Sequence, residues 1–213
     1  MFATYHAMMG MVVSKLPGFF PGAMCRVSDR NAIALTIDDG PSPRGTEALL
    51  HALEATGLKV TCFLTGSAAE AYPTLVRDIA ANGHMLASHG YEHRDFSLAS
   101  ANTVRDDILR SFEAIGERTP WYRPPYGRMN PMHRGIPQML GTELVLWSRM
   151  PREYVRRQSM KHIERRMRSV RGGDILVLHD NERTAGLLPD LVYMLKYIME
   201  EKRLKDTFLM KGQ

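Results

Sequence analysis

Short apolar runs alternate with longer amphipathic segments along this chain. The runs are β-rich and are separated by turn and helix signals, which is typical of buried strands in an α/β protein. We expect strands at Ala32–Ile37, Lys59–Leu64, His84–Ser88, Trp121–Arg123, Glu143–Trp147, Asp174–Leu178 and, with the weakest pattern, Thr207–Met210. Between them, apolar residues recur at three-to-four spacing, which predicts helices over residues 46–56, 73–82, 101–118, 149–171 and 188–201.

Local signals indicate where several of these helices begin and end. Thr46 and Pro73 are residue types that favour a helix start. Gly57, Gly83 and Gly116 follow the first three predicted helices, where the left-handed conformation of the residue after the C-cap favours glycine.

Alternating strands and helices predict parallel strands joined by helical crossovers. This pattern leaves open whether the sheet is doubly wound and open, or a closed or nearly closed barrel. The 213 residues contain no internal repeat, low-complexity tract or Gly/Ser linker, and this length fits one domain better than two. We therefore expect a single α/β domain over residues 1–213, with residues 1–30 as a divergent N-terminal extension.

The composition is that of a globular protein, and the excess positive charge is concentrated in one segment. Hydrophobic residues make up 44% of the chain and charged residues 24%, which argues against intrinsic disorder. The formal net charge is +5, and much of the excess lies in residues 149–171. A solvated helix face is the favoured interpretation, and a surface for phosphates, membranes or acidic polymers is the alternative. Tyr154 is the one aromatic residue among these arginines, so we expect no nucleic-acid partner.

The cysteines and the N-terminal residues give information on the cellular compartment of the protein. Cys62 lies in an apolar run, where a buried thiol is typical, and its pairing with Cys25 is left open. Residues 1–22 are partly apolar but lack a positive leading region and a clear cleavage site. No run approaches the roughly 20 apolar residues that a membrane helix needs. These features favour a soluble, cytoplasmic protein without a membrane span.

Unusual polar residues follow the predicted strands. In a barrel of parallel strands the carboxyl ends open onto one face, where such enzymes build their sites. We therefore expect one site that combines side chains from five elements: Asp38 and Asp39, His89 and His93, Arg123, Trp147 with Glu153, and His179.

The two histidines and two aspartates suggest a metal centre. The spacing of His89 and His93 would put both imidazoles on one side of a helical turn, and two histidines with one carboxylate leave a fourth position open for water. A divalent ion makes such water more acidic, while the second carboxylate accepts its proton. A strand-end turn in which the aspartates cap backbone N–H groups is the structural alternative.

Two further residues fit the same chemistry. Arg123 precedes two prolines that restrict the backbone, and its guanidinium could orient a catalytic carboxylate through a bidentate bond. His179 ends an apolar strand and could protonate a departing amine. A structural ion pair for Arg123 and simple packing for His179 are the alternatives.

Taken in order, these motifs resemble the polysaccharide deacetylase family of carbohydrate esterases (family 4), also called the NodB homology domain. The resemblance runs from about Ile33 to His179 and rests on "TIDDGPSP", "SHGYEH", "RPPYG", a divergent "WSRMPREY" and "ILVLHD". It implies a distorted, incomplete (β/α) barrel, usually of seven strands. It also implies removal of N-acetyl groups from N-acetylglucosamine units in oligo- or polysaccharides.

By this resemblance, Asp38 is the catalytic base, and Asp39, His89 and His93 bind a divalent metal ion. Zinc is the expected ion, while cobalt, nickel and iron also suit these ligands. Arg123 would orient Asp38, and His179 would be the general acid. The backbone N–H of Tyr126 is similar to the family's oxyanion donor.

The fourth motif departs from the family pattern. Glu153 and Tyr154 stand where relatives commonly have an acidic residue and tryptophan, so the resemblance leaves open whether Glu153 pairs with His179 or Arg123. Val177 occupies a position that relatives usually fill with leucine in the acetyl-methyl pocket. We expect an acetylated carbohydrate substrate. The alternatives are a deacylase or esterase acting on O-acetylated sugars or small non-sugar amides, and a non-catalytic carbohydrate-binding protein.

Overall fold

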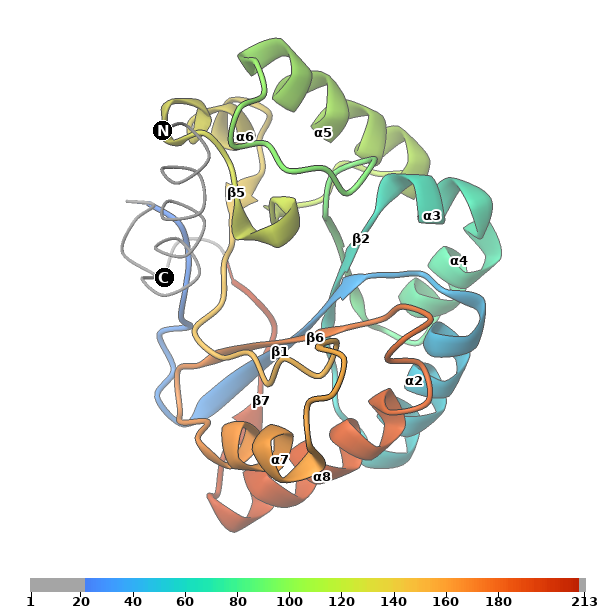
Figure 1. Cartoon of the computed structure of the whole chain (residues 1–213), viewed down its shortest axis with the longest axis vertical. Helices are drawn as coiled ribbons and strands as arrows, with labels where there is room; N and C mark the ends of the chain where they lie inside the picture. The colour runs from blue at the N-terminus through green and yellow to red at the C-terminus, as the bar shows by residue number, and fades with distance from the viewer. Residues whose placement is uncertain (1–21, 211–213) are drawn as a thin grey trace.

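The computed structural model describes residues 22–210, arranged as a curled parallel sheet surrounded by helices (Figure 1). Most of the expected N-terminal extension, residues 1–21, lies outside the described residues. Among residues 22–210, no helix is long and apolar enough to cross a membrane.

The sheet has seven strands among the described residues, and each strand pairs in parallel with its neighbours. The order is β5-β4-β3-β2-β1-β6, and β7 also pairs with β1. The bounds are β1 Ala32–Asp39, β2 Thr61–Leu64, β3 Met85–Ser88, β4 Trp121–Tyr122, β5 Glu143–Leu144, β6 Ile175–His179 and β7 Lys205–Asp206. The expected incomplete (β/α) barrel is thereby confirmed.

Strand β1 lies at the centre of the sheet and delivers the aspartate pair. It is buried from Ala32 to Asp38, as expected for a strand covered on both faces. Its register places Asp38 opposite Phe63 of β2 and His179 of β6. The first aspartate and the last histidine motif are therefore neighbours in the sheet, although they are far apart in the sequence.

The gap between β5 and β6 is partly closed by the segment that follows β5. Arg149 forms an isolated parallel bridge with Leu176, and the Val177 N–H donates to the Arg149 carbonyl at 3.0 Å. The expected strand Glu143–Trp147 is thus shortened to Glu143–Leu144, and the chain joins the β6 edge a few residues later. The last strand also differs from expectation, because β7 lies at Lys205–Asp206 rather than Thr207–Met210.

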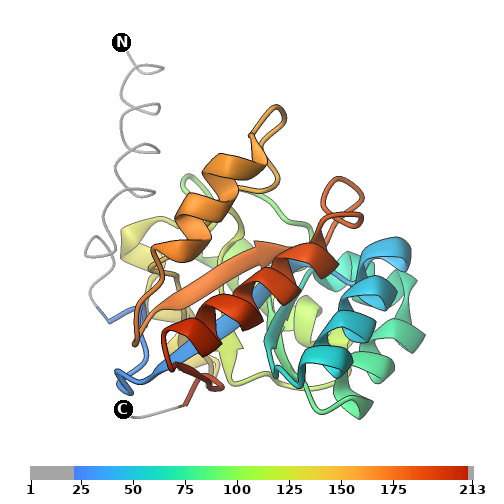
Figure 2. The same ribbon diagram turned by 90° about the horizontal axis from the view of Figure 1, so that it is seen from below.

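Helices cover the outside of the sheet. Their bounds are α2 Pro43–Thr56, α3 Gly66–Ala71, α4 Pro73–Ala81, α5 Ala101–Ile115, α6 Ile136–Met139, α7 Met160–Arg168 and α8 Leu188–Glu201. Figure 2 shows α8 lying across β1 and β6. The short helices α3 and α6 were not predicted, because each is only about one turn and carries no repeating apolar face.

Two helix starts differ from the sequence expectation. Helix α2 begins at Pro43, and the Ser42 hydroxyl accepts from the Gly45 N–H, so Ser42 and not Thr46 is the N-cap. In the basic segment only Met160–Arg168 is helical, and residues 149–159 form a loop instead. The expected C-terminal glycines are confirmed, because Gly57, Gly83 and Gly116 all have positive φ.

Apolar side chains fill both sides of the sheet. One cluster packs the strands against α2, α4, α7 and α8, and includes Cys62, which is buried as expected. A second cluster fills the barrel interior with Ala34, Phe63, Trp121 and Ile175. The interior is therefore packed, and the open space lies above it, at the carboxyl ends of the strands.

Candidate active site

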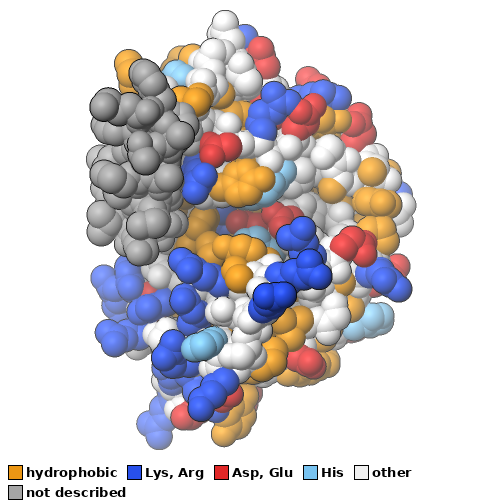
Figure 3. Space-filling model, in the orientation of Figure 1, with side chains coloured by type: hydrophobic (Ala, Val, Ile, Leu, Met, Phe, Trp, Pro, Cys, Tyr) orange, Lys and Arg blue, Asp and Glu red, His pale blue; other side chains and the backbone are white. Residues whose placement is uncertain are grey.

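A cavity of about 920 Å³ opens at the carboxyl ends of the strands. In the space-filling view this hollow has acidic and histidine side chains at its floor and basic side chains around it (Figure 3). Asp38, Asp39, His89, His93 and His179 all line it. The structure therefore brings together residues from β1, the loop after β3, and β6, as the strand-end pattern predicted.

Asp39, His89 and His93 form a potential metal-binding group. One ligand atom from each residue can be chosen so that all three lie within 4.8 Å of one another. The expected helical turn between the histidines is wrong, because residues 89–93 form a loop. Gly90 has φ 77° and His93 has φ 44°, and this left-handed backbone turns both imidazoles toward β1. Their ring centroids are 5.1 Å apart.

The unsatisfied polar atoms of this group fit a cation. Asp39 Oδ1 is buried and has no hydrogen-bond partner among the described residues, although His93 Nε2 lies 3.2 Å away. His89 Nδ1 is bound to the Arg123 carbonyl at 2.8 Å, which leaves Nε2 facing Asp39 at 3.8 Å. A backbone carbonyl on the remote ring nitrogen is the arrangement that fixes the tautomer of a metal-binding histidine.

Protonation of the same residues agrees with this fit. Burial lowers the pKa of His89 to about 4, so its imidazole is neutral near pH 7 and can donate an electron pair. Burial by itself raises the pKa of the Asp39 carboxyl, but the neighbouring imidazoles of His93 and His89 outweigh it, and the net pKa is lowered. A neutral imidazole and an ionised carboxylate are the forms that bind divalent metals.

Asp38 is held by the buried guanidinium of Arg123. Arg123 is fully buried, and its Nη1 donates to Asp38 Oδ1 at 2.5 Å and to Thr36 Oγ1 at 3.0 Å. The expected bidentate bond is not formed, because Nη2 and Nε donate instead to the carbonyls of Leu146 and Val145. Arg123, which directly follows β4, thus fixes Asp38 relative to the segment that follows β5.

His179 is paired with Glu153, which decides between the two partners that the sequence left open. Glu153 Oε1 lies 2.8 Å from His179 Nδ1 and also accepts from the His179 backbone N–H at 2.8 Å. Burial lowers the pKa of His179, but the hydrogen bond and the charge of Glu153 outweigh this, and the net pKa is raised. Glu153 therefore stabilises the imidazolium form of His179, and Nε2 is left for the cavity. The rings of Tyr154 and His179 pack edge to face, with their centroids 4.5 Å apart.

The remaining predicted residues are distributed between the rim and the core. Tyr126 lines the cavity and is 55% exposed. Its ring centroid lies 4.7 Å from that of His93. Trp147 also lines the cavity and packs so closely on Gly127 that a Cβ there would be 2.7 Å from the indole ring. Val177 is fully buried in β6 and is not among the lining residues. The structure therefore does not place Val177 at the cavity wall.

Backbone strain is concentrated at this site. Six non-glycine residues among those described have positive φ, and four of them line the cavity: Asp39 (80°), His93 (44°), Tyr126 (60°) and Arg152 (64°). Such conformations cost free energy and cluster at functional sites, where the surrounding structure holds them in place. Sequence reasoning could not detect this strain, because none of these residues is a glycine.

Sequence analysis also missed two residues that brace the aspartates. Asn181 Nδ2 donates to Asp39 Oδ2 at 2.8 Å. Asp180 accepts from the Ser42 hydroxyl at 2.6 Å and the Thr46 hydroxyl at 2.5 Å, which ties the loop after β6 to the turn after β1. Their position directly after His179 was the available signal.

Comparisons with known proteins point to one family. A profile described as polysaccharide deacetylase matches residues 26–145. A chitooligosaccharide deacetylase from Bradyrhizobium sp. (strain ANU 289) is 31% identical over 159 residues, which cover 72% of this chain and 73% of that protein. Peptidoglycan-N-acetylglucosamine deacetylase PgdA of Listeria monocytogenes is 30% identical over 156 residues, covering 71% of this chain. This match covers only 33% of the Listeria protein.

Solved structures agree with these matches. A family 4 carbohydrate esterase from Streptomyces lividans, determined in complex with acetate, superposes with a TM-score of 0.75 at 28% identity. The alignment covers 86% of this chain and 95% of the Streptomyces chain. The similarity therefore extends over most of the fold.

Proposed function

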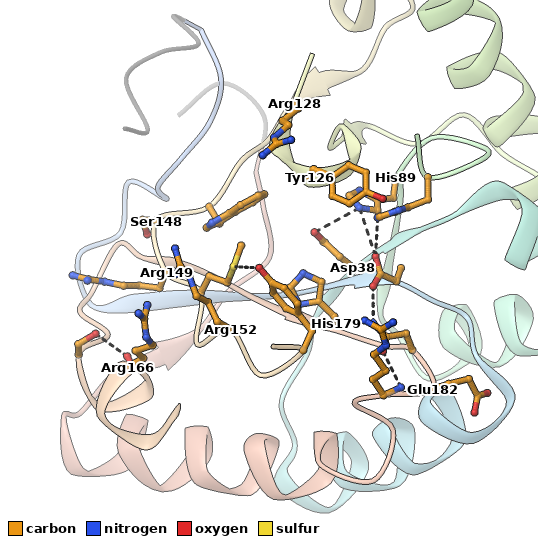
Figure 4. Close-up of a pocket in the computed structure, with 18 residues that line it drawn as sticks. Asp38, His89, Tyr126, Arg128, Ser148, Arg149, Arg152, Arg166, His179 and Glu182 are labelled. Atoms are coloured by element: carbon orange, nitrogen blue, oxygen red, sulfur yellow. Dashed lines mark hydrogen bonds and ion pairs between the residues drawn. The ribbon is translucent and has the colours of Figure 1, made fainter. Parts of the chain in front are cut away.

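Because the chain belongs to the polysaccharide deacetylase family, we propose that it is a metal-dependent hydrolase. We propose that it removes N-acetyl groups from N-acetylglucosamine-containing oligo- or polysaccharides. The observation that carries the proposal is one cavity in which a potential metal-binding group, a buried carboxylate and a carboxylate-paired histidine meet. Figure 4 shows Asp38, His89 and His179 directed toward the same space.

Asp39, His89 and His93 would hold the metal ion. When bound, a divalent ion supplies Lewis acidity, which polarises an amide carbonyl and acidifies water. Asp39 supplies the negative charge for binding, and Asn181 keeps the second carboxylate oxygen in place through its bond to Asp39 Oδ2.

Asp38 would act as the general base. Arg123 holds Oδ1, so Oδ2 is the oxygen left to take a proton from the attacking water. Oδ2 lies 3.9 Å from His89 Nε2, which places the base beside the metal-binding group. Because the Arg123 guanidinium is itself fixed by two carbonyls, Asp38 is held in one orientation before substrate arrives.

His179 would supply the proton to the leaving nitrogen. Glu153 occupies Nδ1, so the proton on Nε2 is the one presented to the cavity. Protonating the nitrogen allows the C–N bond to break, leaving acetate and a free amine. The Tyr126 N–H lies in the strained loop after the two prolines, and we assign it to stabilising the oxygen that becomes negative during the reaction.

The test is acetate release from N-acetylglucosamine oligomers by the metal-loaded protein. We expect Asp38→Asn to lower kcat by roughly 10²–10⁴, the usual contribution of a general base. Metal content should stay at the wild-type level, because Asp38 is not assigned as a ligand. Glu182→Gln is the matched control, since this exposed carboxylate lines the same cavity but makes no hydrogen bond or ion pair with Asp38, Asp39 or His179. Full activity of Asp38→Asn would refute the assignment.

O-acetylated sugars and small non-sugar amides are the alternative substrates. The same residues could hydrolyse an ester, whose leaving oxygen also needs a proton. An assay of acetate release from acetylated xylan, run beside the N-acetylglucosamine oligomers, separates the two. Bound metal with no turnover on any acylated substrate would instead indicate a non-catalytic carbohydrate-binding protein.

A further inference from the structure

The loop that carries the two histidines lies against two helices that pack together. Residues 89–93, here called the histidine loop, follow β3, and α3 and α5 lie side by side next to it (Figure 1). Within this loop His93 has φ 44°, a left-handed conformation that is unfavourable for a non-glycine residue. Contacts with the rest of the protein must therefore hold the loop in this shape.

Helix α3 binds the carbonyl groups of the histidine loop. The Gly66 N–H donates to the Gly90 carbonyl at 2.8 Å, and the Ser67 N–H donates to the Tyr91 carbonyl at 2.9 Å. The first N–H groups of a helix have no partner inside the helix, so they are available for this contact. The start of α3 thus fixes two successive carbonyls of the loop.

Helix α5 binds the N–H groups of the same loop through one carboxylate. Asp107 Oδ1 accepts from the Tyr91 N–H at 2.7 Å, and Asp107 Oδ2 accepts from the Glu92 N–H at 3.4 Å. The remaining N–H between the histidines, that of Gly90, donates to the Ser88 hydroxyl at 3.2 Å. All three N–H groups between the histidines are therefore paired, and two of them depend on Asp107.

Other contacts place the same face of α5 directly against the loop. A Cβ at Gly90 would lie 2.7 Å from Asp107 Oδ1. One turn later on α5, the Ser111 hydroxyl lies 2.6 Å from the hydroxyl of Ser88, which accepts the Gly90 N–H. Residues four apart lie on one face of a helix, so Asp107 and Ser111 form a single polar strip that faces the loop.

The Tyr91 side chain is bound by both helices as well. Its hydroxyl donates to Glu70 on α3 and accepts from Arg110 Nη2 on α5 at 2.8 Å. The guanidinium carbon of Arg110 lies 3.6 Å from the centroid of the Tyr91 ring. These contacts fix the ring, whereas the orientation of the peptide groups that lead to His93 depends on Asp107.

The neighbouring carboxylate of α5 has a different environment. Asp106 is exposed and pairs with Arg105 at 2.8 Å, whereas Asp107 is half-buried and reaches the histidine loop. Asp107 does not line the cavity and is not part of the potential metal-binding group. Any effect of Asp107 on that group must therefore act through the loop.

We propose that Asp107 is a positioning residue that holds the histidine loop ready for the metal ion. By fixing the peptide groups of Tyr91 and Glu92, it keeps both imidazoles directed at Asp39 before an ion arrives. Without this carboxylate, only a fraction of the molecules presents both imidazoles together, and the apparent metal affinity falls by that fraction. The inference rests on the metal-binding group of the proposed function, and it gives Asp107 no contact with substrate.

The test measures the zinc affinity of the full-length, metal-free protein by competition with a chromophoric chelator near neutral pH. Asp107→Ala removes both acceptors, and zinc affinity should fall roughly 10-fold to 100-fold, the range for groups that orient metal ligands. Asp107→Asn keeps the size of the side chain but replaces one acceptor oxygen by a donor, so zinc affinity should fall roughly threefold to tenfold. Asp106→Ala is the matched control and should bind zinc as the wild type does.

A second control separates positioning from a general loss of stability. Val192 is fully buried on α8, which packs on α2 and α7, and Val192→Ala should destabilise the fold without changing zinc affinity. Urea denaturation of the metal-free variants gives the stability of each, and if Asp107→Ala does not fold, Asp107→Asn decides. Wild-type zinc affinity in Asp107→Asn, or an equally large loss in Val192→Ala, overturns the proposal.

Zinc binding and acetate release together separate this proposal from the proposed function. Tight zinc binding that Asp107→Asn weakens supports the positioning role even if no acylated substrate is turned over. Acetate release by the zinc-loaded wild type, with the same zinc affinity in the Asp107 variants, leaves the deacetylase assignment standing and removes the positioning role. A wild-type protein that binds neither zinc nor cobalt contradicts both.

Discussion

At the scale of single residues, the two neighbouring aspartates have different surroundings. Asp38 is 2% exposed and bound to a buried guanidinium, whereas Asp39 turns into a left-handed conformation toward two imidazoles. Adjacent residues of a strand point to opposite faces, so both aspartates reach one cavity only because Asp39, the last residue of β1, departs from the extended conformation. This change of backbone conformation gives one aspartate to a potential base position and the other to a potential metal position.

The assignment of His179 as the general acid can be tested at this scale through Glu153 and the pH dependence of activity. A general acid must be protonated, so the rate is expected to fall as the pH rises through the pKa of His179. Glu153 raises that pKa, while burial alone would lower it. Glu153→Gln should therefore move the alkaline limb of the kcat/KM profile to lower pH. An unchanged alkaline limb would show that His179 is not the acid or that Glu153 does not control it. Glu182→Gln should leave the limb in place.

At the scale of elements, the turn after β1 and the loop after β6 are locked together. Asp180 accepts hydrogen bonds from Ser42 and Thr46, and the Asp180 side chain lies so close to Gly45 that a side chain at this position of α2 would clash with it. A Cβ on Gly45 would lie 2.0 Å from Asp180 Oδ1 and 2.5 Å from Ser42 Oγ. The position of Asp38 and Asp39 therefore depends on a contact between residues that are well over a hundred positions apart.

The Gly45→Ala substitution measures this contact. Alanine favours a helix by about 1 kcal/mol over glycine, yet the clash with Asp180 should dominate and lower the free energy of unfolding by roughly 1–3 kcal/mol. Gly186→Ala is the control, because a Cβ at Gly186 meets no atom within 4 Å and should change stability by less than about 0.5 kcal/mol. Urea denaturation of both variants gives the comparison, and equal stabilities would show that the turn can relax.

At the scale of the whole molecule, the metal-binding group joins the end of β1 to the loop after β3. A ligand that binds the folded chain alone stabilises it by about 2.7 kcal/mol at a hundredfold excess over Kd. We expect zinc to raise the Tm of the wild-type protein, and His93→Ala to lose both the shift and the bound metal. His51→Ala is the control, because His51 is exposed on α2. Stoichiometric metal in His93→Ala, measured by elemental analysis, would contradict the ligand assignment.

The sequence by itself determined the order of strands and helices and the residues that gather at the strand ends. Helix α8 has the bounds of its apolar pattern, Leu188–Glu201, because a long repeat of three-to-four spacing is a local property. The motifs similarly indicated which residues would share a site, since parallel strands open their carboxyl ends onto one face.

Only the tertiary structure decided how these residues meet. Residues 149–159 form a loop rather than a helix because Arg149 bonds to β6, a partner that local spacing does not reveal. Three contacts depend on residues that are far apart in the sequence: the pairing of Glu153 with His179, the single bond from Arg123 to Asp38, and the approach of His93 to Asp39.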